Sequence, residues 1–179
     1  MLVGAEGAPV CAPVPVVVVG EAPPVVDGEY HLFLSHAQDL GQDQVATIKT
    51  ALEKLLPTIS IFLDVESLDD THKLENLVAS SQKLLIFLTA GCLRKYFVRQ
   101  EVLAAVAHGN GIIAVQESDE RHGERPIAEH REDCPADAKE AIFDGEHKAI
   151  LWFRTAHYKL VSLKQIIQRM VVEPNKELP

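Results

Sequence analysis

Five short apolar segments, separated by longer amphipathic ones, constrain the fold of this chain more than any other feature. The clearest is Leu84–Leu88, LLIFL, which is apolar at every position. A strand covered on both faces has this pattern, because neither face meets water. All five segments have the length of a strand, so the sequence predicts five strands. The other four are Tyr30–Leu34, Thr58–Leu63, Ile112–Val115 and Ala149–Phe153.

Apolar residues with helical spacing occupy the intervening segments. In Gln42–Leu56, for example, Val45, Ile48 and Leu52 recur every three or four positions. The alternation of strands and helices predicts an α/β fold in which a parallel sheet lies between two layers of helices. The predicted helices are Gln42–Leu56, Leu74–Ser81, Leu93–His108 with its end at Gly109, and His157–Val171, with a weaker helical pattern in Ala136–Phe143.

The two ends of the chain differ in composition from the segment between them. Residues 1–28 consist mainly of Val, Ala, Pro and Gly, and proline blocks helix formation, so we expect a disordered lead. Residues 29–172 form one predicted domain, and residues 173–179 a short polar tail. The apolar run Val16–Val19 follows no basic residue and is too short to span a bilayer. We therefore expect neither a signal peptide nor a transmembrane helix.

Charge and cysteine content exclude several classes of function. The formal net charge is -9 at pH 7, whereas nucleic acids and anionic membranes bind basic surfaces. A local positive pocket is still compatible with this charge. Cys11, Cys92 and Cys134 form no CxxC pair, and the histidines lack short fixed spacings, so we expect no disulfide framework and no metal site. Few cysteines fit a reducing compartment, which predicts a cytoplasmic protein.

Ligands of parallel α/β sheets bind beyond the carboxyl ends of the strands, which directs attention to the loops there. The first loop, after Leu34, lacks the glycines of a dinucleotide- or phosphate-binding loop. Ser35 and His36 are adjacent, and adjacent side chains of a strand point to opposite faces. Catalysis by a Ser–His pair is therefore disfavoured, and hydrogen bonding within the loop is favoured.

Two further segments carry candidate chemistry. The acidic stretch Asp64–Asp70 could hold Mg²⁺ through carboxylate oxygens, or could be an exposed turn before the next helix. Phe97 and Glu101 are four residues apart and share one face of a predicted helix. Glu101 is expected at the edge of a buried face near the strand ends, although the pattern alone favours a solvated glutamate.

Several segments resemble TIR (Toll/interleukin-1 receptor) domains, in the order that this family has them. Ile61–Asp69, IFLDVESLD, is similar to the second strand and the following BB loop, and Leu32–His36 to the first strand and its loop. Lys95–Glu101, KYFVRQE, resembles the family's aromatic-x-x-x-Glu helix, and Gly109–Val115 the fourth strand. The resemblance is greatest to NAD-cleaving TIR domains such as that of the animal axon-degeneration SAM/TIR protein. It implies a flavodoxin-like three-layer sandwich, the TIR fold.

The resemblance implies one of two functions. The first is an NAD⁺ nucleohydrolase that releases nicotinamide and an ADP-ribose product, is active on self-association and acts in signalling. Its catalytic residue would be Glu101, and NAD⁺ would be a substrate, with no cofactor. The alternative is a non-catalytic protein–protein interaction module, either adaptor or scaffold. Both imply TIR–TIR contacts with further copies or with other TIR proteins. The positions expected to contact NAD⁺ are Ser35, His36, Leu68, Asp69 and Phe97.

The sequence departs from the NAD-cleaving pattern in three places. Ala37 and Gln38 stand where animal forms carry basic residues, which leaves diphosphate binding to other groups, with Arg94, Lys95 and Arg99 as candidates. Phe97 stands where tryptophan is common. The BB loop has Asp70-Thr71-His72 where a glycine is common, so its backbone has less freedom. A receiver domain is a weaker alternative, because no lysine ends the last strand, where Phe153-Arg154-Thr155 stands.

Overall fold

A single parallel sheet organises the residues that the computed structural model describes, which are 29–63, 71–145 and 148–171. Its strand order is β2-β1-β3-β4-β5, and every neighbouring pair is parallel. The five predicted strands and their parallel arrangement are confirmed. The strands are β1 (Tyr30–His36), β2 (Ile61–Leu63), β3 (Ser81–Leu88), β4 (Gly111–Glu117) and β5 (Ile150–Trp152).

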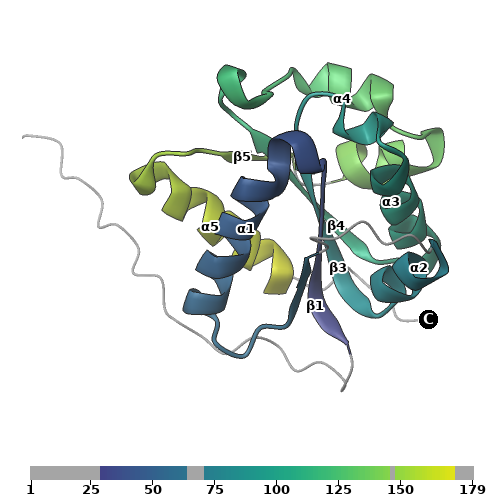
Figure 1. Cartoon of the computed structure of the whole chain (residues 1–179), viewed down its shortest axis with the longest axis horizontal. Coiled ribbons are helices and arrows are strands. Elements are labelled where there is room, and N and C mark those ends of the chain that lie inside the picture. The colour runs from purple at the N-terminus through teal and green to yellow at the C-terminus, as the bar shows by residue number, and fades with distance from the viewer. Residues whose placement is uncertain (1–28, 64–70, 146–147, 172–179) are drawn as a thin grey trace, which may run out of the picture.

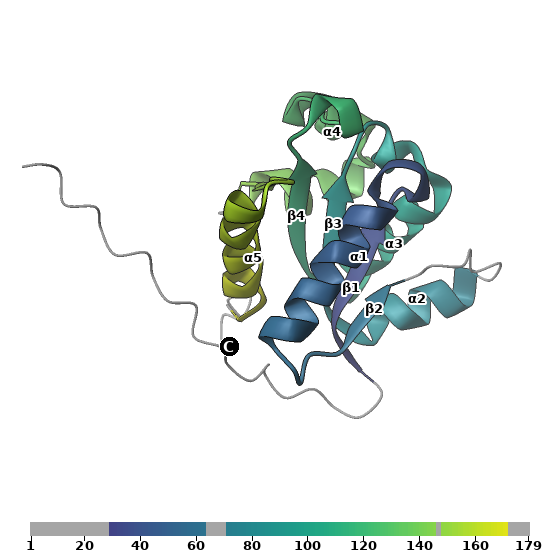
Figure 2. The ribbon, with the colours of Figure 1, turned by 60° about the vertical axis from the view of Figure 1, so that its left-hand side comes forward.

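Helices cover both faces of the sheet, so that the molecule has three layers (Figures 1 and 2). Helices α1 (Gln38–Leu55) and α5 (Ala156–Val171) pack on one face. Helices α2 (Thr71–Ala79) and α3 (Tyr96–His108) pack on the other. The predicted three-layer α/β sandwich is therefore confirmed. Within the described residues, no helix has both the length and the apolar character needed to cross a bilayer.

Alternation along the inner strand β1 divides the core into two clusters. Leu32 and Leu34 on β1 belong to the cluster under α1 and α5, whereas Phe33 belongs to the cluster under α2 and α3. This is the side-chain period of a strand that is buried on both faces. On the α1 side, Trp152 is fully buried, and its Nε1 donates a hydrogen bond to Oε1 of Gln44 at 2.9 Å. The indole therefore keeps a polar partner inside the core.

Some predicted boundaries were wrong by several residues. Helix α1 begins at Gln38 instead of Gln42, because its first turn lies at the polar surface and lacks the apolar spacing used for the prediction. Strand β2 begins at Ile61 instead of Thr58, because Pro57 and Thr58 form a turn in which the N–H of Ile59 bonds to the carbonyl of Leu56. The helix predicted from Leu93 starts only at Tyr96, since Lys95 is extended (φ -68°, ψ 134°).

The polar stretch between β4 and β5 contains more helix than the sequence predicted. Helix α4 (Ile127–Asp133) follows Pro126, but its short polar sequence has no apolar periodicity that predicts it. The weak helical pattern in Ala136–Phe143 corresponds to a 3₁₀ turn at Ala136–Ala138 and a single π-helical turn at Glu140–Asp144.

The end of α3 is as the sequence predicts. Gly109 has a left-handed backbone (φ 72°), and its N–H bonds to the carbonyls of Ala105 and Val106. Glycine adopts this conformation without strain, which is why it commonly ends helices. The next residue, Asn110, donates side-chain hydrogen bonds to the carbonyls of Val78 and Ser81, so the helix end is tied to the chain around β3.

The candidate site lies at the carboxyl end of β1, which extends beyond the residues that pair with β2. The three residues of β2 pair with Leu32, Phe33 and Leu34 of β1. Ser35 and His36 extend further and pair only with β3 among the described residues. The carboxyl end of β1 thus lies beside the amino ends of α1 and α3.

Candidate functional site

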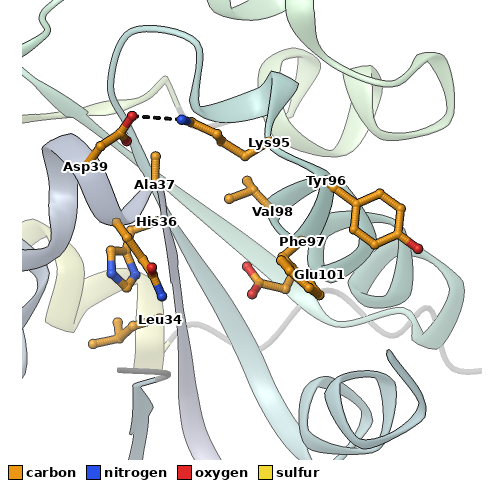
Figure 3. A pocket seen from close by; sticks show the side chains of 10 residues that line it. Leu34, His36, Ala37, Asp39, Lys95, Tyr96, Phe97, Val98 and Glu101 are labelled. Carbon is orange, nitrogen blue, oxygen red and sulfur yellow. Dashed lines mark hydrogen bonds and ion pairs between the residues drawn. The ribbon is translucent and has the colours of Figure 1, made fainter. Parts of the chain in front are cut away.

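A pocket of about 380 Å³ lies at the carboxyl end of β1. It is bounded by the end of the strand, the first turn of α1 and the first turns of α3 (Figure 3). This is the edge at which parallel α/β sheets bind ligands. The lining residues are Leu34, His36, Ala37, Gln38, Asp39, Lys95, Tyr96, Phe97, Val98 and Glu101.

Glu101 is the central polar group of this pocket. Its side chain is 6% exposed, although α3 is a surface helix, and it lines the cavity. In Figure 3 its carboxylate points toward the side of the pocket on which His36 lies. Carboxylates are almost never buried to this degree without partners, because desolvation of the charge is costly. The solvated glutamate that the pattern alone favoured is therefore wrong.

Ser35 supports the Glu101 carboxylate from the inner strand β1. Its hydroxyl Oγ donates a hydrogen bond to Oε2 of Glu101, and both residues are buried. Ser35 points to the α3 side because it lies two positions after Phe33, which packs on that same side. The strand period thus brings together two groups that are 66 positions apart in the sequence.

The other residues predicted for the site differ in their placement. His36 is 8% exposed and lines the pocket, as does Phe97, which is 39% exposed. Leu68 and Asp69, predicted to close the pocket, lie outside the described residues. The acidic stretch Asp64–Asp70, interpreted as a possible Mg²⁺ site, also lies outside them.

The three basic residues considered for diphosphate binding are not equivalent. Lys95 lines the pocket, whereas Arg94 and Arg99 do not. Nε of Arg94 forms an ion pair with Asp133 at 2.7 Å, and Nη1 of Arg99 donates to the carbonyl of the same residue at 3.4 Å. Both arginines face α4, a helix that the sequence did not predict. In this structure Arg94 and Arg99 are therefore directed away from the pocket, and their role in diphosphate binding stays a prediction.

Sequence reasoning missed Asp39 and Tyr96. Asp39, in the first turn of α1, forms an ion pair with Lys95 at 2.7 Å between Oδ2 and Nζ. The hydrogen bond from Lys95 is the main cause that lowers the pKa of Asp39, so its carboxyl group is ionised. Tyr96 is 61% exposed, and its ring points away from Glu101 (Figure 3). Its neighbour Phe97 was the aromatic residue that the sequence singled out in this part of the chain.

A second hollow lies on the far side of Tyr96, between α2 and α3. It has a volume of about 330 Å³ and is lined mainly by apolar and small side chains of the two helices. Tyr96 is common to both hollows. Within the described part of the chain, no cluster of three or more His, Cys, Asp or Glu side chains could hold a metal ion.

A parallel three-layer domain, with a pocket at the carboxyl end of its inner strand β1, is the class that the fold and site define. No protein-family model matches this sequence, and no curated protein sequence matches it. Solved structures do match. One is a metazoan TIR-STING receptor from C. gigas in complex with 2',3'-cGAMP, with a TM-score of 0.56 and 12% identity over 85% of this chain. This chain covers 43% of that receptor, so it spans less than half its length.

Two further matches are TIR domains over nearly their full length. The TIR domains of the activated Roq1 resistosome, which directly recognises the pathogen effector XopQ, have a TM-score of 0.57 and 12% identity, over 79% of this chain and 99% of theirs. The TIR domain of the Toll-related receptor TRR-2 from Hydra magnipapillata has a TM-score of 0.51 and 11% identity, over 79% and 98%. This chain has the fold of a TIR domain.

Proposed function

We propose that this TIR-fold protein is an NAD⁺ nucleohydrolase, with Glu101 as its catalytic residue. The observation that carries the proposal is the buried Glu101 carboxylate, hydrogen-bonded by Ser35 and facing a pocket. A carboxylate that is itself buried and held in place by a hydrogen bond is suited to stabilise a positive charge that develops during a reaction.

The chemistry requires little more than this carboxylate. When the bond between ribose C1' and the nicotinamide nitrogen breaks, its electron pair returns to the ring, and neutral nicotinamide leaves without a general acid. The ribosyl group becomes oxocarbenium-like, and the Glu101 carboxylate stabilises it, as carboxylates do in glycosidases. A water oxygen then bonds to C1' and loses its proton, which completes ADP-ribose. Phe97 provides an aromatic wall beside this carboxylate.

Nicotinamide release by the full chain tests the proposal. Purified protein is incubated with NAD⁺ at high concentration with a crowding agent, and its self-association is measured in the same samples. We expect release that falls at least about 100-fold in Glu101→Ala and Glu101→Gln, because the group acting on the reacting carbon is lost. Glu132→Ala, on the exposed surface of α4, is the matched control and should retain activity. If the self-associated protein released no nicotinamide, the proposed enzymatic activity would be refuted.

The second candidate is a non-catalytic interaction module, and one observation favours it. Tyr158 and Val161 are three positions apart on α5, so they share one side of the helix, and they are more than half exposed, at 60% and 51%. Leu160, in the same turn, is 57% exposed. Neighbouring exposed apolar side chains of this size are typical of surfaces that bind other proteins. Self-association that is lost in Leu160→Asp, without any nicotinamide release by the parent protein, would support the module instead of the enzyme.

A further inference from the structure

The ion pair between Asp39 and Lys95 spans one end of the candidate site. It joins the first turn of α1 to the residue before α3, across 56 positions of sequence. Figure 3 shows it beside the space that Glu101 faces. Both side chains are about half exposed, at 55% for Asp39 and 49% for Lys95. Exposed ion pairs of this kind are weak, so a ligand can break this one at small cost.

Asp39 stands in the first turn of α1, at the amino end of the helix. The residue that precedes the helix, Ala37, offers no side-chain hydrogen bond to this helix end. Amide N–H groups of a helix start, combined with an ammonium group, are the donors that proteins use to bind phosphate. In this structure, an acidic side chain stands at this helix start and pairs with the ammonium group of Lys95.

Lys95 has no basic neighbour to assist it in the described part of the pocket. Among the described lining residues it is the only lysine or arginine, while Asp39 and Glu101 are both acidic. Arg94 and Arg99, the nearest basic residues in sequence, are directed to Asp133. A ligand that carries phosphate therefore has Lys95 as its ammonium partner here, and it must compete with Asp39 for that partner.

We propose that Asp39 is an internal competitor for a ligand phosphate: its carboxylate holds Lys95 at the start of α1 until a diphosphate displaces it. The ligand class rests on the function proposed above. Lys95 and Glu101 are six positions apart, which corresponds to about 9 Å along a helix axis. A dinucleotide lying along α3 can then place its diphosphate at Lys95 while the adjoining ribose lies at Glu101.

Binding of ADP and of adenosine to the full chain, measured by calorimetry, tests this competition without requiring catalysis. The parent protein should bind ADP more tightly than adenosine. Asp39→Asn should bind ADP about two- to fivefold more tightly than the parent, because the competing charge is lost. Lys95→Gln should lose most of the preference for ADP, and the double variant should resemble Lys95→Gln. Adenosine affinity should stay the same in all four proteins.

Two matched controls separate the effect from general changes in charge. Asp43→Asn removes an acidic group one turn further along α1, and Arg94→Gln removes a cation next to Lys95, yet neither residue lines the pocket. Both should bind ADP as the parent does. Circular dichroism confirms that each variant is folded.

The competition would be refuted if Asp39→Asn bound ADP no more tightly than the parent, or if no folded variant preferred ADP to adenosine. Nicotinamide release is measured separately on the same proteins. The variants can show the expected ADP affinities while NAD⁺ is not cleaved. In that case the proposed enzymatic activity fails, and the competition between Asp39 and a ligand phosphate stands.

Discussion

Oγ of Ser35, near the end of the inner strand β1, donates a hydrogen bond to Oε2 of Glu101 on α3. One residue comes from the sheet and the other from the helix layer above it, and both are buried. The relationship fixes the direction of a carboxylate that otherwise has several rotamers. Ser35 therefore acts through Glu101 and has the character of a positioning residue.

Replacement of Ser35 by alanine should reduce both stability and activity. Loss of a donor to a buried charged group should lower the free energy of unfolding by about 1.5–3 kcal/mol. If NAD⁺ is cleaved, we expect kcat to fall about tenfold with little change in KM, because a disordered carboxylate affects the transition state more than binding. Urea denaturation and initial rates measure the two effects. Ser80→Ala is the control, since that exposed hydroxyl bonds only within α2 and its end; equal effects of both variants would contradict the positioning role.

Phe97 should contribute to ligand binding more than to folding. Its side chain lines the pocket but is 39% exposed, so Phe97→Ala should cost less than about 2 kcal/mol of stability. The loss of an aromatic wall should raise KM for NAD⁺ several-fold, whereas Phe97→Trp should retain or lower it. Steady-state kinetics and thermal melts test this, with Ile127→Ala on α4, which is 42% exposed, as an exposed apolar control. An unchanged KM in Phe97→Ala would exclude contact with the substrate.

Stability should depend on pH through His130 on α4. This side chain is 2% exposed, and its Nε2 has no hydrogen-bond partner among the described residues. Burial lowers the pKa of His130 in the folded protein below its usual range near 6.5. Below about pH 6.5 the unfolded chain gains a proton that the folded protein resists, so stability falls as pH decreases from there toward the folded pKa.

Urea titrations at pH 7.5 and 5.5 measure this dependence. His130→Gln should lose less stability between these two pH values than the parent protein, because its side chain does not titrate. His157→Gln, at an exposed position of α5, should behave as the parent does. A parent-like pH dependence in His130→Gln would show that other groups are responsible.

Gly109 should resist replacement for a purely conformational reason. An added Cβ would meet no atom within 4 Å, but the backbone has φ +72°. Gly109→Ala should therefore lower the free energy of unfolding by about 1–2 kcal/mol, the cost of a left-handed conformation for an L-residue. Gly145 is the matched control, since it also has open space around its Cβ position, yet has φ -66°. Equal costs of the two alanine substitutions would contradict this explanation.

The sequence predicted those parts of the fold that depend on local apolar patterns. Leu84–Leu88 could only be a buried strand, and the spacing of Val45, Ile48 and Leu52 identified α1. Helix α4 was missed because it is short and mostly polar, and has no apolar period to reveal it. The missed helix also explains why the sequence did not reveal that Arg94 and Arg99 are directed to Asp133, the last residue of α4.

In the candidate site, too, the sequence predicted the local features and missed the contacts between distant segments. The pairing of Phe97 and Glu101 on one helix face is local, and the sequence contains it. The contacts that complete the pocket, Ser35 with Glu101 and Asp39 with Lys95, join segments more than 50 positions apart. Such contacts depend on how β1, α1 and α3 pack together, and no pattern along a single sequence specifies them. The roles of Ser35, His36, Phe97 and Glu101 in binding or catalysis stay predictions.

The alternation along β1 has a consequence for how this protein can change. Phe33 and Ser35 face α3, while Leu34 faces α1, so one odd–even pattern sets both the packing of the core and the direction of the Glu101 donor. Insertion or deletion of a single residue in this strand would exchange the two faces. Such a change would bury the wrong side chains and, at the same time, turn the Ser35 hydroxyl away from the Glu101 carboxylate. Substitutions can therefore vary the pocket gradually, but a change in the length of β1 would have to alter core and pocket together.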